Sequence, residues 1–337
     1  MDSTHFVLAL DYELYFGTRV GSVERCMLEP VDELIRQTRK LGMKLTLFVD
    51  SGCLLAYRRH GQDQVFNAIA GQLQRLYREG HDVQLHIHPH WQDTTIVGDS
   101  VDMDTGRYRL HDFDEADRVA IVRDYKAVLE DIIEAPVTAY RAGGWCLQPF
   151  DKISAALAAE GVAIDSTVYS GGLSRDTGRE FDFLRAPDID HWHFDQDPVV
   201  PVVGGQFLEL PITPVKVTPW FYLRSQVQRK LQPQAHANFG DGQYLAHDWR
   251  YYQERLLSTS ISPASVDGAK ASQLPAAYAG MRKRGGSLLN VMGHPKALAP
   301  ASIADLVQFL GSHKFEFQTI RSYAADVAAT PNLAQSA

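Results

Sequence analysis

The sequence predicts an α/β fold in which parallel strands are joined by helices, and two observations support it. Short apolar runs alternate with longer amphipathic segments over most of residues 5–170, and this alternation returns near residue 285. Strand–helix alternation with short links is typical of parallel strands connected by helical crossovers. The 337 residues exceed one average domain, but α/β barrels reach this length as single units. We therefore expect one catalytic domain over residues 1–337.

The first half of the chain supplies these elements in order. The apolar run 6–10 predicts the first strand. The segment 31–42 places apolar residues at helical spacing and ends at a glycine, as helices commonly do. The following elements are predicted to be strand 44–50, helix 64–80, strand 81–88, helix 114–133, strand and loop 136–144, helix 151–161 and strand 162–168.

The pattern changes after about residue 172. Residues 172–215 are rich in Asp, Pro and Gly and contain short β-like pieces such as 206–213. The segment 216–285 is predicted to be an inserted helical and loop segment. Its expected parts are helices at 220–232 and 244–258 and a polar loop at 260–273. The remaining elements are predicted to be strand 285–294, helix 301–311 and strand 314–320, with a frayed tail.

Composition and charge exclude several classes of protein. A net charge of -8 without a basic cluster argues against nucleic acid as the main partner. No run reaches the ~18–20 apolar residues of a membrane span, and the first residues lack a secretory signal. Three widely spaced cysteines fit a reducing compartment. We therefore expect a cytoplasmic protein; the sequence does not set its oligomeric state.

Polar and ionisable side chains gather where the predicted strands end. The carboxyl ends of parallel strands in a barrel meet at one rim, where active sites lie, so we expect residues far apart in sequence to share a pocket. These residues are Asp11, Glu13, Asp50, His86, His88, His90, Arg141, Asp165 and His294.

The stretch QLHIHPHW, residues 84–91, contains three histidines at alternate positions. A metal that activates water needs two or three imidazoles or carboxylates and one open position. His86 and His90 have even spacing, and His88 shares it, although Pro89 bends the chain between them. A surface turn without a ligand role is the alternative interpretation.

The stretch DYE, residues 11–13, supplies two carboxylates after the first strand. One of them could bind a metal while the other accepts a proton from the metal-bound water. A solvated loop or a helix cap would use the same residues. A short acidic motif of this kind also occurs in glycosyltransferases that bind a metal–nucleotide sugar, but the glycine-rich phosphate loop of many nucleotide binders is absent.

The run GHDVQLHIHPH, residues 80–90, resembles the second motif of the NodB-homology polysaccharide deacetylases, carbohydrate esterase family 4. ALDYE, YRAGG, IDST and VMGHPK resemble four other motifs in the expected order, so that the resemblance covers roughly residues 5–325. It implies a distorted (β/α)7-type barrel with an inserted segment. The stretch LDYELYFGTRVGSVE is most similar to the branch named for the lipopolysaccharide biosynthesis protein WalW, which implies a role in surface polysaccharide assembly.

The resemblance also implies metal ligands. It assigns them to His86 and His90, with Glu13 as the third. Tyr12 separates Asp11 from Glu13, whereas the family has adjacent aspartates, so the roles of the two carboxylates could be exchanged. His88 is expected to be a neighbour of the site or to face substrate. Zinc is the expected ion, although manganese, cobalt or nickel suit the same ligands.

The remaining site residues are implied in the same way. Asp11 corresponds to the base, and Arg141 would orient it. His294 corresponds to the acid, and Asp165 would orient or tune it. Gly144 would offer a main-chain N–H to an oxyanion, although glycines replace the usual residues of this motif. Independently of the resemblance, Trp145 could stack on a sugar ring, with anchoring of the core or of a loop as the alternative role.

The function that these residues imply is metal-dependent hydrolysis of an N-acetyl or other acyl group on a carbohydrate or lipid-linked sugar. Two other functions remain open on the sequence alone. One is a metal-dependent glycosyltransferase that uses the DYE stretch. The other is a catalytically silent homologue that binds a sugar or a partner enzyme.

Overall fold

A curled, mainly parallel sheet forms the centre of the computed structural model, which describes residues 3–98, 100–176, 178–245, 255 and 257–329. The strand order is β10-β11-β7-β6-β3-β2-β1-β14, β15 also pairs with β1, and only β10 runs antiparallel to its neighbour. The strands are β1 (His5–Tyr12), β2 (Leu45–Asp50), β3 (Asp82–Ile87), β6 (Ala139–Ala142), β7 (Ile164–Asp165), β10 (Trp192–Phe194), β11 (Phe207–Glu209), β14 (Leu288–Gly293) and β15 (Glu316–Gln318).

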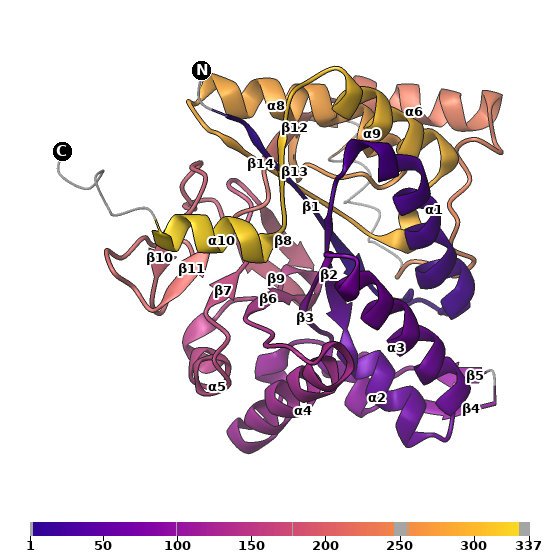
Figure 1. Ribbon diagram of the computed structural model, residues 1–337, viewed down its shortest axis with the longest axis vertical. Helices are drawn as coiled ribbons and strands as arrows, with labels where there is room; N and C mark the ends of the chain where they lie inside the picture. The colour runs from indigo at the N-terminus through magenta and orange to yellow at the C-terminus, as the bar shows by residue number, and fades with distance from the viewer. Residues whose placement is uncertain (1–2, 99, 177, 246–254, 256, 330–337) are drawn as a thin grey trace.

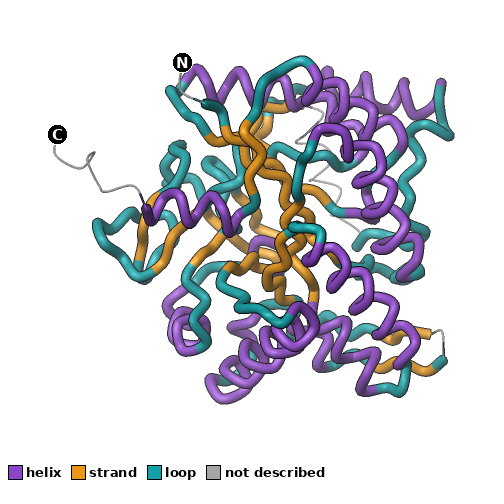
Figure 2. Tube along the Cα trace, viewed as in Figure 1, coloured by secondary structure: helices purple, strands orange, loops and turns teal. Residues whose placement is uncertain are grey.

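Helices cover the outside of this sheet, and the strands lie in the middle of the molecule (Figures 1 and 2). The helices are α1 (Glu29–Thr38), α2 (Ser51–Arg59), α3 (Asp63–Arg78), α4 (Glu115–Ile133), α5 (Ser154–Ala159), α6 (Pro219–Leu231), α8 (Leu274–Lys283), α9 (Pro300–Gly311) and α10 (Ile320–Ala329). Among the described residues, three two-stranded ribbons lie outside the sheet: β4 (Thr95–Val97) with β5 (Ser100–Asp102), β8 (Leu173–Asp176) with β9 (Arg179–Asp182), and β12 (Pro214–Val217) with β13 (Ser260–Pro263).

The amphipathic pattern explains why the helices form where they do. In α3 the buried residues Ile69, Leu73 and Leu76 recur at helical spacing and face the core. The long helix α4 starts at Asp114, whose carboxylate accepts a hydrogen bond from the backbone N–H of Asp117 and so satisfies a free donor of the first turn. None of the described helices is both long and apolar enough to cross a bilayer.

The strand register carries the polar residues to one rim. Asp50 at the end of β2 pairs with His86 in β3, and His86 pairs with Arg141 in β6. At the other side of the sheet, Leu10 of β1 pairs with Gly293 of β14. Because these parallel strands end at the same height, the side chains that follow them converge on one site.

The predicted α/β barrel fold is confirmed, with differences in detail. The helices α2, α8 and α10 were not expected, and short strands enlarge the sheet beyond the expected seven or so. The predicted helix 220–232 is present as α6, whereas the predicted helix 244–258 falls largely outside the described residues. The expected polar loop at 260–273 begins with β13. The limits of the insertion at about 216–285 stay a prediction.

Candidate active site

Asp11 and Glu13 face the site together because the chain is still extended at the end of β1. Successive side chains of a strand point to opposite faces. Tyr12 accordingly points away, and its buried hydroxyl donates to Oε1 of Gln72 at 2.7 Å. The tyrosine between the two acids is therefore a packing residue, and the D-x-E spacing places both carboxylates on the rim.

Three side chains form the centre of the site: Glu13, His86 and His88. Oε2 of Glu13 lies 3.1 Å from Nε2 of His86 and 2.9 Å from Nε2 of His88. All three residues are buried, and their ligand atoms lie within 4.8 Å of one another. Two imidazoles and one carboxylate are a donor set that catalytic zinc commonly uses.

The hydrogen bonding of His86 fits a metal ligand. Nδ1 of His86 lies 2.8 Å from the backbone carbonyl of Arg141, and because a carbonyl only accepts, Nδ1 carries a hydrogen. Nε2 of the neutral ring then directs a lone pair toward the carboxylate of Glu13. This contact is repulsive unless a proton or a cation lies between the two groups. A proton on Nε2 satisfies this contact when His86 is an imidazolium, and a divalent ion would satisfy it in place of that proton, so the residues present fit such an ion.

Lys296 is a fourth member of this cluster that the sequence reasoning missed. Its Nζ lies 2.8 Å from Oε1 of Glu13 and also donates to the carbonyl of Leu14, and the side chain is buried. Burial disfavours the ionised form of Glu13, but Lys296, His88 and His86 outweigh it and hold the pKa of the carboxyl well below its usual range. Lys296 therefore holds one oxygen of Glu13 and leaves the other facing the two imidazoles.

His86 and His88 differ in the protonation state that their surroundings favour. Burial acts against the imidazolium of His86, but Asp11 and Glu13 overcome it and raise its pKa to about 8. For His88 burial prevails and lowers the pKa to about 4. Its buried Nδ1 has no hydrogen-bond partner among the described residues. His88 is thus a neutral imidazole at neutral pH, the form that binds metal ions.

The sequence prediction placed His90 in the ligand set, whereas the donor atoms that lie together in the described residues belong to Glu13, His86 and His88. The ligand role of His90 stays a prediction; both of its buried ring nitrogens lack a hydrogen-bond partner among the described residues. Pro89 begins a tight helical turn over Pro89–Gln92, and this turn ends the alternation of the strand. His88 is still extended, with φ of -114° and ψ of 96°, and shares the face of His86. His90 turns aside and stacks on Tyr108, with ring centroids 5.6 Å apart at an angle of 9°.

Arg141 holds Asp11 in the manner that the resemblance implied. Nη1 of Arg141 donates to Oδ1 of Asp11 at 2.7 Å, and both side chains are buried. The Nε group of Arg141 donates to the carbonyl of Ser166 at 2.7 Å, and the guanidinium lies over the Phe48 ring. These contacts fix the direction of the arginine, and through it one oxygen of Asp11.

His294 lies across the site, and its other nitrogen is held by Asp267. Nδ1 of His294 is 2.8 Å from Oδ2 of Asp267, while Nε2 is 3.7 Å from Oδ2 of Asp11 and 3.6 Å from Oε1 of Glu13. Burial would lower the pKa of His294, but the carboxylates of Asp267, Asp11 and Glu13 raise it. The imidazolium form is therefore favoured.

The expectation that Asp165 orients His294 is corrected by this contact with Asp267. Asp165 instead accepts hydrogen bonds from the backbone N–H and the hydroxyl of Thr167, both at 2.9 Å. It also forms a buried pair with Glu209, and burial raises the pKa of both carboxyls, so the pair retains a proton. Asp267 comes from the segment that the sequence interpretation treated as a polar loop.

Gly144 and Trp145 lie in a tight turn after β6. Both have positive φ, 61° and 60°, and a Cβ on Gly144 would lie 2.8 Å from the ring of Tyr108. Glycine is therefore required here by both conformation and space. The ring of Trp145 is half-buried, with its centroid 5.9 Å from those of Tyr169 and Phe181. The substrate contacts expected of these two residues stay predictions.

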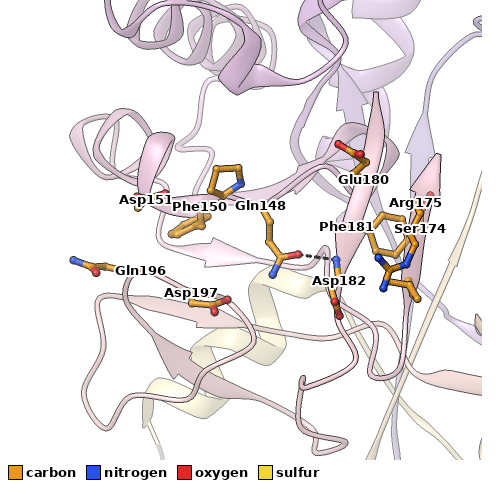
Figure 3. A pocket seen from close by; sticks show the side chains of 12 residues that line it. Gln148, Phe150, Asp151, Ser174, Arg175, Glu180, Phe181, Asp182, Gln196 and Asp197 are labelled. Atoms are coloured by element: carbon orange, nitrogen blue, oxygen red, sulfur yellow. Dashed lines mark hydrogen bonds between the residues drawn. The ribbon is translucent and has the colours of Figure 1, made fainter. Parts of the chain in front are cut away.

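A separate cavity of about 710 Å³ lies beside this turn, between the 148–151 segment and the β8–β9 ribbon (Figure 3). Phe181 lines the cavity and connects it to Trp145, and the backbone N–H of Asp182 donates to Oε1 of Gln148 at 2.8 Å. The other polar lining residues are Asp151, Ser174, Arg175, Glu180, Gln196 and Asp197. None of the predicted site residues lines this cavity, so it is distinct from the metal-ligand cluster.

Comparison with known proteins establishes the fold. No family model and no curated protein matches the sequence. A solved structure from Mycobacterium smegmatis, described as a polysaccharide deacetylase, is 16% identical and covers 100% of this chain and 96% of its own, with a TM-score of 0.51. A Pseudomonas aeruginosa PAO1 protein of the same description is 14% identical, with a TM-score of 0.52 and coverage of 98% and 92%.

The allantoinase PuuE is also similar in structure, at 13% identity, with a TM-score of 0.53 and coverage of 98% of this chain and 92% of its own. Each of these identities is too low to carry an activity from one protein to another, but the similarity extends over nearly the whole chain. The chain therefore has the curled (β/α) barrel fold of NodB-type polysaccharide deacetylases.

Proposed function

We propose that this protein is a metal-dependent hydrolase that removes an N-acetyl or other acyl group from a carbohydrate. The observation that supports the proposal most directly is that three kinds of group meet at one rim of the sheet. They are a set of possible metal ligands, the carboxylate of Asp11 held by Arg141, and the imidazole of His294 held by Asp267. Glu13, His86 and His88 would hold the ion. Asp11 and His294 lie next to this ligand set and next to each other, with Nε2 of His294 3.7 Å from Oδ2 of Asp11.

Zinc is the ion that the two imidazoles and one carboxylate suit, with manganese, cobalt and nickel as substitutes. When bound, it would polarise the substrate carbonyl and acidify a water molecule. Glu13 is engaged by both imidazoles and by Lys296, so Asp11 is assigned as the general base. Arg141 fixes one oxygen of Asp11, so the other oxygen is free to accept a proton from water.

His294 is assigned as the general acid. Asp267 holds its Nδ1–H, and in the imidazolium form, which Asp267 favours by raising the pKa, Nε2 carries the proton that the leaving amine needs. The main chain near Gly144 is the proposed oxyanion donor, and one good donor lowers the barrier by about 3–4 kcal/mol. Trp145 is the proposed sugar contact. The sequence resemblance supports placing this reaction in cytoplasmic steps of surface polysaccharide or lipopolysaccharide biosynthesis, on a free or lipid-linked sugar.

The test is acetate release from N-acetylated oligosaccharides by the zinc-loaded protein, with bound zinc measured in the same samples. We expect His86→Ala to lose both metal and turnover, and His294→Ala to keep metal but lose turnover. His193→Ala is the matched control, because His193 lies in β10 at the far edge of the sheet. Wild-type protein that binds zinc but transfers a sugar from a nucleotide sugar, without releasing acetate, would overturn the proposal.

A further inference from the structure

The helix α6 presents a stripe of large apolar side chains to solvent. Trp220, Leu223, Val227 and Leu231 are 70%, 52%, 54% and 76% exposed. These positions are three or four residues apart, so they lie along one face of the helix. The buried residues of α6, Phe221 among them, point the other way. Single exposed apolar residues are ordinary, whereas four on one helical face mark an interaction surface.

The charged residues of α6 itself have a single sign, although Asp305 of the neighbouring α9 interacts with Arg224. The helix contains Arg224, Arg229 and Lys230 and no acidic residue. The whole segment 210–240 contains four basic residues and no acidic one, in a chain whose net charge is -8. By helical position, Arg224 and Lys230 flank the apolar stripe on its two sides. Arg224 also donates to Oγ of Ser272 at 3.1 Å, which ties the helix to the body of the protein.

We propose that α6 is a docking helix for the surface of an anionic lipid bilayer. An amphipathic helix with an aromatic and aliphatic face bordered by basic residues lies in the plane of the interface, with its apolar side chains among the acyl chains. Tryptophan favours the headgroup level, which suits Trp220 at the start of the helix. The unbroken positive charge of the segment selects negatively charged headgroups.

None of the residues of this surface is a candidate metal ligand, and the proposal holds whether or not the protein releases acetate. If both hold, docking would bring the active site to glycans carried on lipid. Each basic side chain near an anionic surface contributes ~1 kcal/mol, so removing the charges of Arg224 and Lys230 weakens partitioning about 20- to 30-fold. Polar replacements at Trp220 and Val227 remove apolar burial and weaken it at least ~10-fold.

The experiment is flotation of the full chain with vesicles of phosphatidylcholine, alone or with about one-third phosphatidylglycerol. We expect wild type to float with the mixed vesicles and much less with neutral ones. Binding to the mixed vesicles should fall at least ~10-fold in the double variant Trp220→Ser/Val227→Ser. It should fall about 20- to 30-fold in the double variant Arg224→Gln/Lys230→Gln. Val97→Ser is the control, because Val97 is 72% exposed but lies in the β4–β5 ribbon. Thermal unfolding checks that each variant is folded.

Two results would overturn the proposal. One is that wild-type protein mixed with anionic vesicles at low salt does not float with them. The other is a folded Trp220→Ser/Val227→Ser variant that binds as wild type does. Acetate release is not read in this assay, so a failure here is distinguishable from a failure of the proposed hydrolase function.

Discussion

Replacing Lys296 by methionine is the most informative perturbation of the candidate site. The change keeps the apolar stem but removes the ammonium group that lies 2.8 Å from Oε1 of Glu13. Lys296 and Glu13 are 3% and 4% exposed, so the remaining carboxylate would be buried next to neutral or weakly basic groups. Breaking a buried ion pair by removing one partner costs about 3–5 kcal/mol.

Part of this cost is offset because Glu13 can take up a proton or pair more fully with His86. We therefore expect the free energy of unfolding of the metal-free protein to fall by about 3 kcal/mol, near the lower limit of that range. At ~2 °C per kcal/mol for a chain of this size, the midpoint of thermal unfolding falls by roughly 6 °C. A divalent ion then replaces the missing positive charge, so saturating zinc stabilises the variant more than it stabilises wild type.

The assay is thermal unfolding of chelator-treated protein with and without added zinc. Lys216→Met is the matched control, because Lys216 is exposed on β12 and should leave both midpoints unchanged. The reasoning is refuted if metal-free Lys296→Met unfolds within ~1 °C of wild type. It is also refuted if zinc stabilises the variant less than wild type, because Lys296 would then assist metal binding.

Four other predictions concern proton transfer, metal binding and the ion pair that holds Asp11. His294→Asn should keep zinc while acetate release falls by ~10²–10⁴; Asp267 raises the pKa of His294, so Asp267→Asn should move the alkaline limb of the pH–rate profile to lower pH. Zinc binding at pH 7 should release about one proton, because the pKa of His86 is raised to about 8 and only the neutral ring binds a metal ion. Titration calorimetry in buffers of different ionisation enthalpy measures the number of protons released. Arg141→Met should cost about 3–5 kcal/mol in denaturant unfolding, because Asp11 loses its buried partner; an unchanged midpoint would contradict this.

The sequence was sufficient to predict the fold because its signals are local. Apolar runs and amphipathic helices follow one another with clear stops, and parallel strands then place their ends at one rim. Asp11, Glu13, His86, Arg141 and His294 all lie at that rim in the structure. The helix α2 was missed because it begins at Ser51, directly after the last residue of β2, with no loop between strand and helix.

The details of the site depend on geometry that periodicity does not contain. His86, His88 and His90 share one parity, and only the turn at Pro89 decides that His88 continues the strand while His90 leaves it. A proline three residues after His86 was a usable signal, but the sequence did not specify whether the alternation would end before or after it.

The partner of His294 illustrates a second limit of sequence reasoning. Asp165 and Asp267 both lie in segments that approach the rim, and their roles are separated only by three-dimensional contacts. Lys296 was visible in the VMGHPK stretch, but a lysine that is buried beside a metal ligand cannot be told from an exposed one by sequence pattern. Its position follows from the turn Pro295–Ala297, which directs the side chain back to β1.

The most direct test of the metal-centre assignment is the position of the ion itself. Crystals of the protein grown with zinc, measured on both sides of the zinc absorption edge, locate the ion by its anomalous scattering. We expect one strong peak bound by Glu13 and by Nε2 of His86 and His88, with Zn–N distances of about 2.0–2.1 Å. A peak bound by His90 in place of His88, or no peak at this rim, would contradict the account.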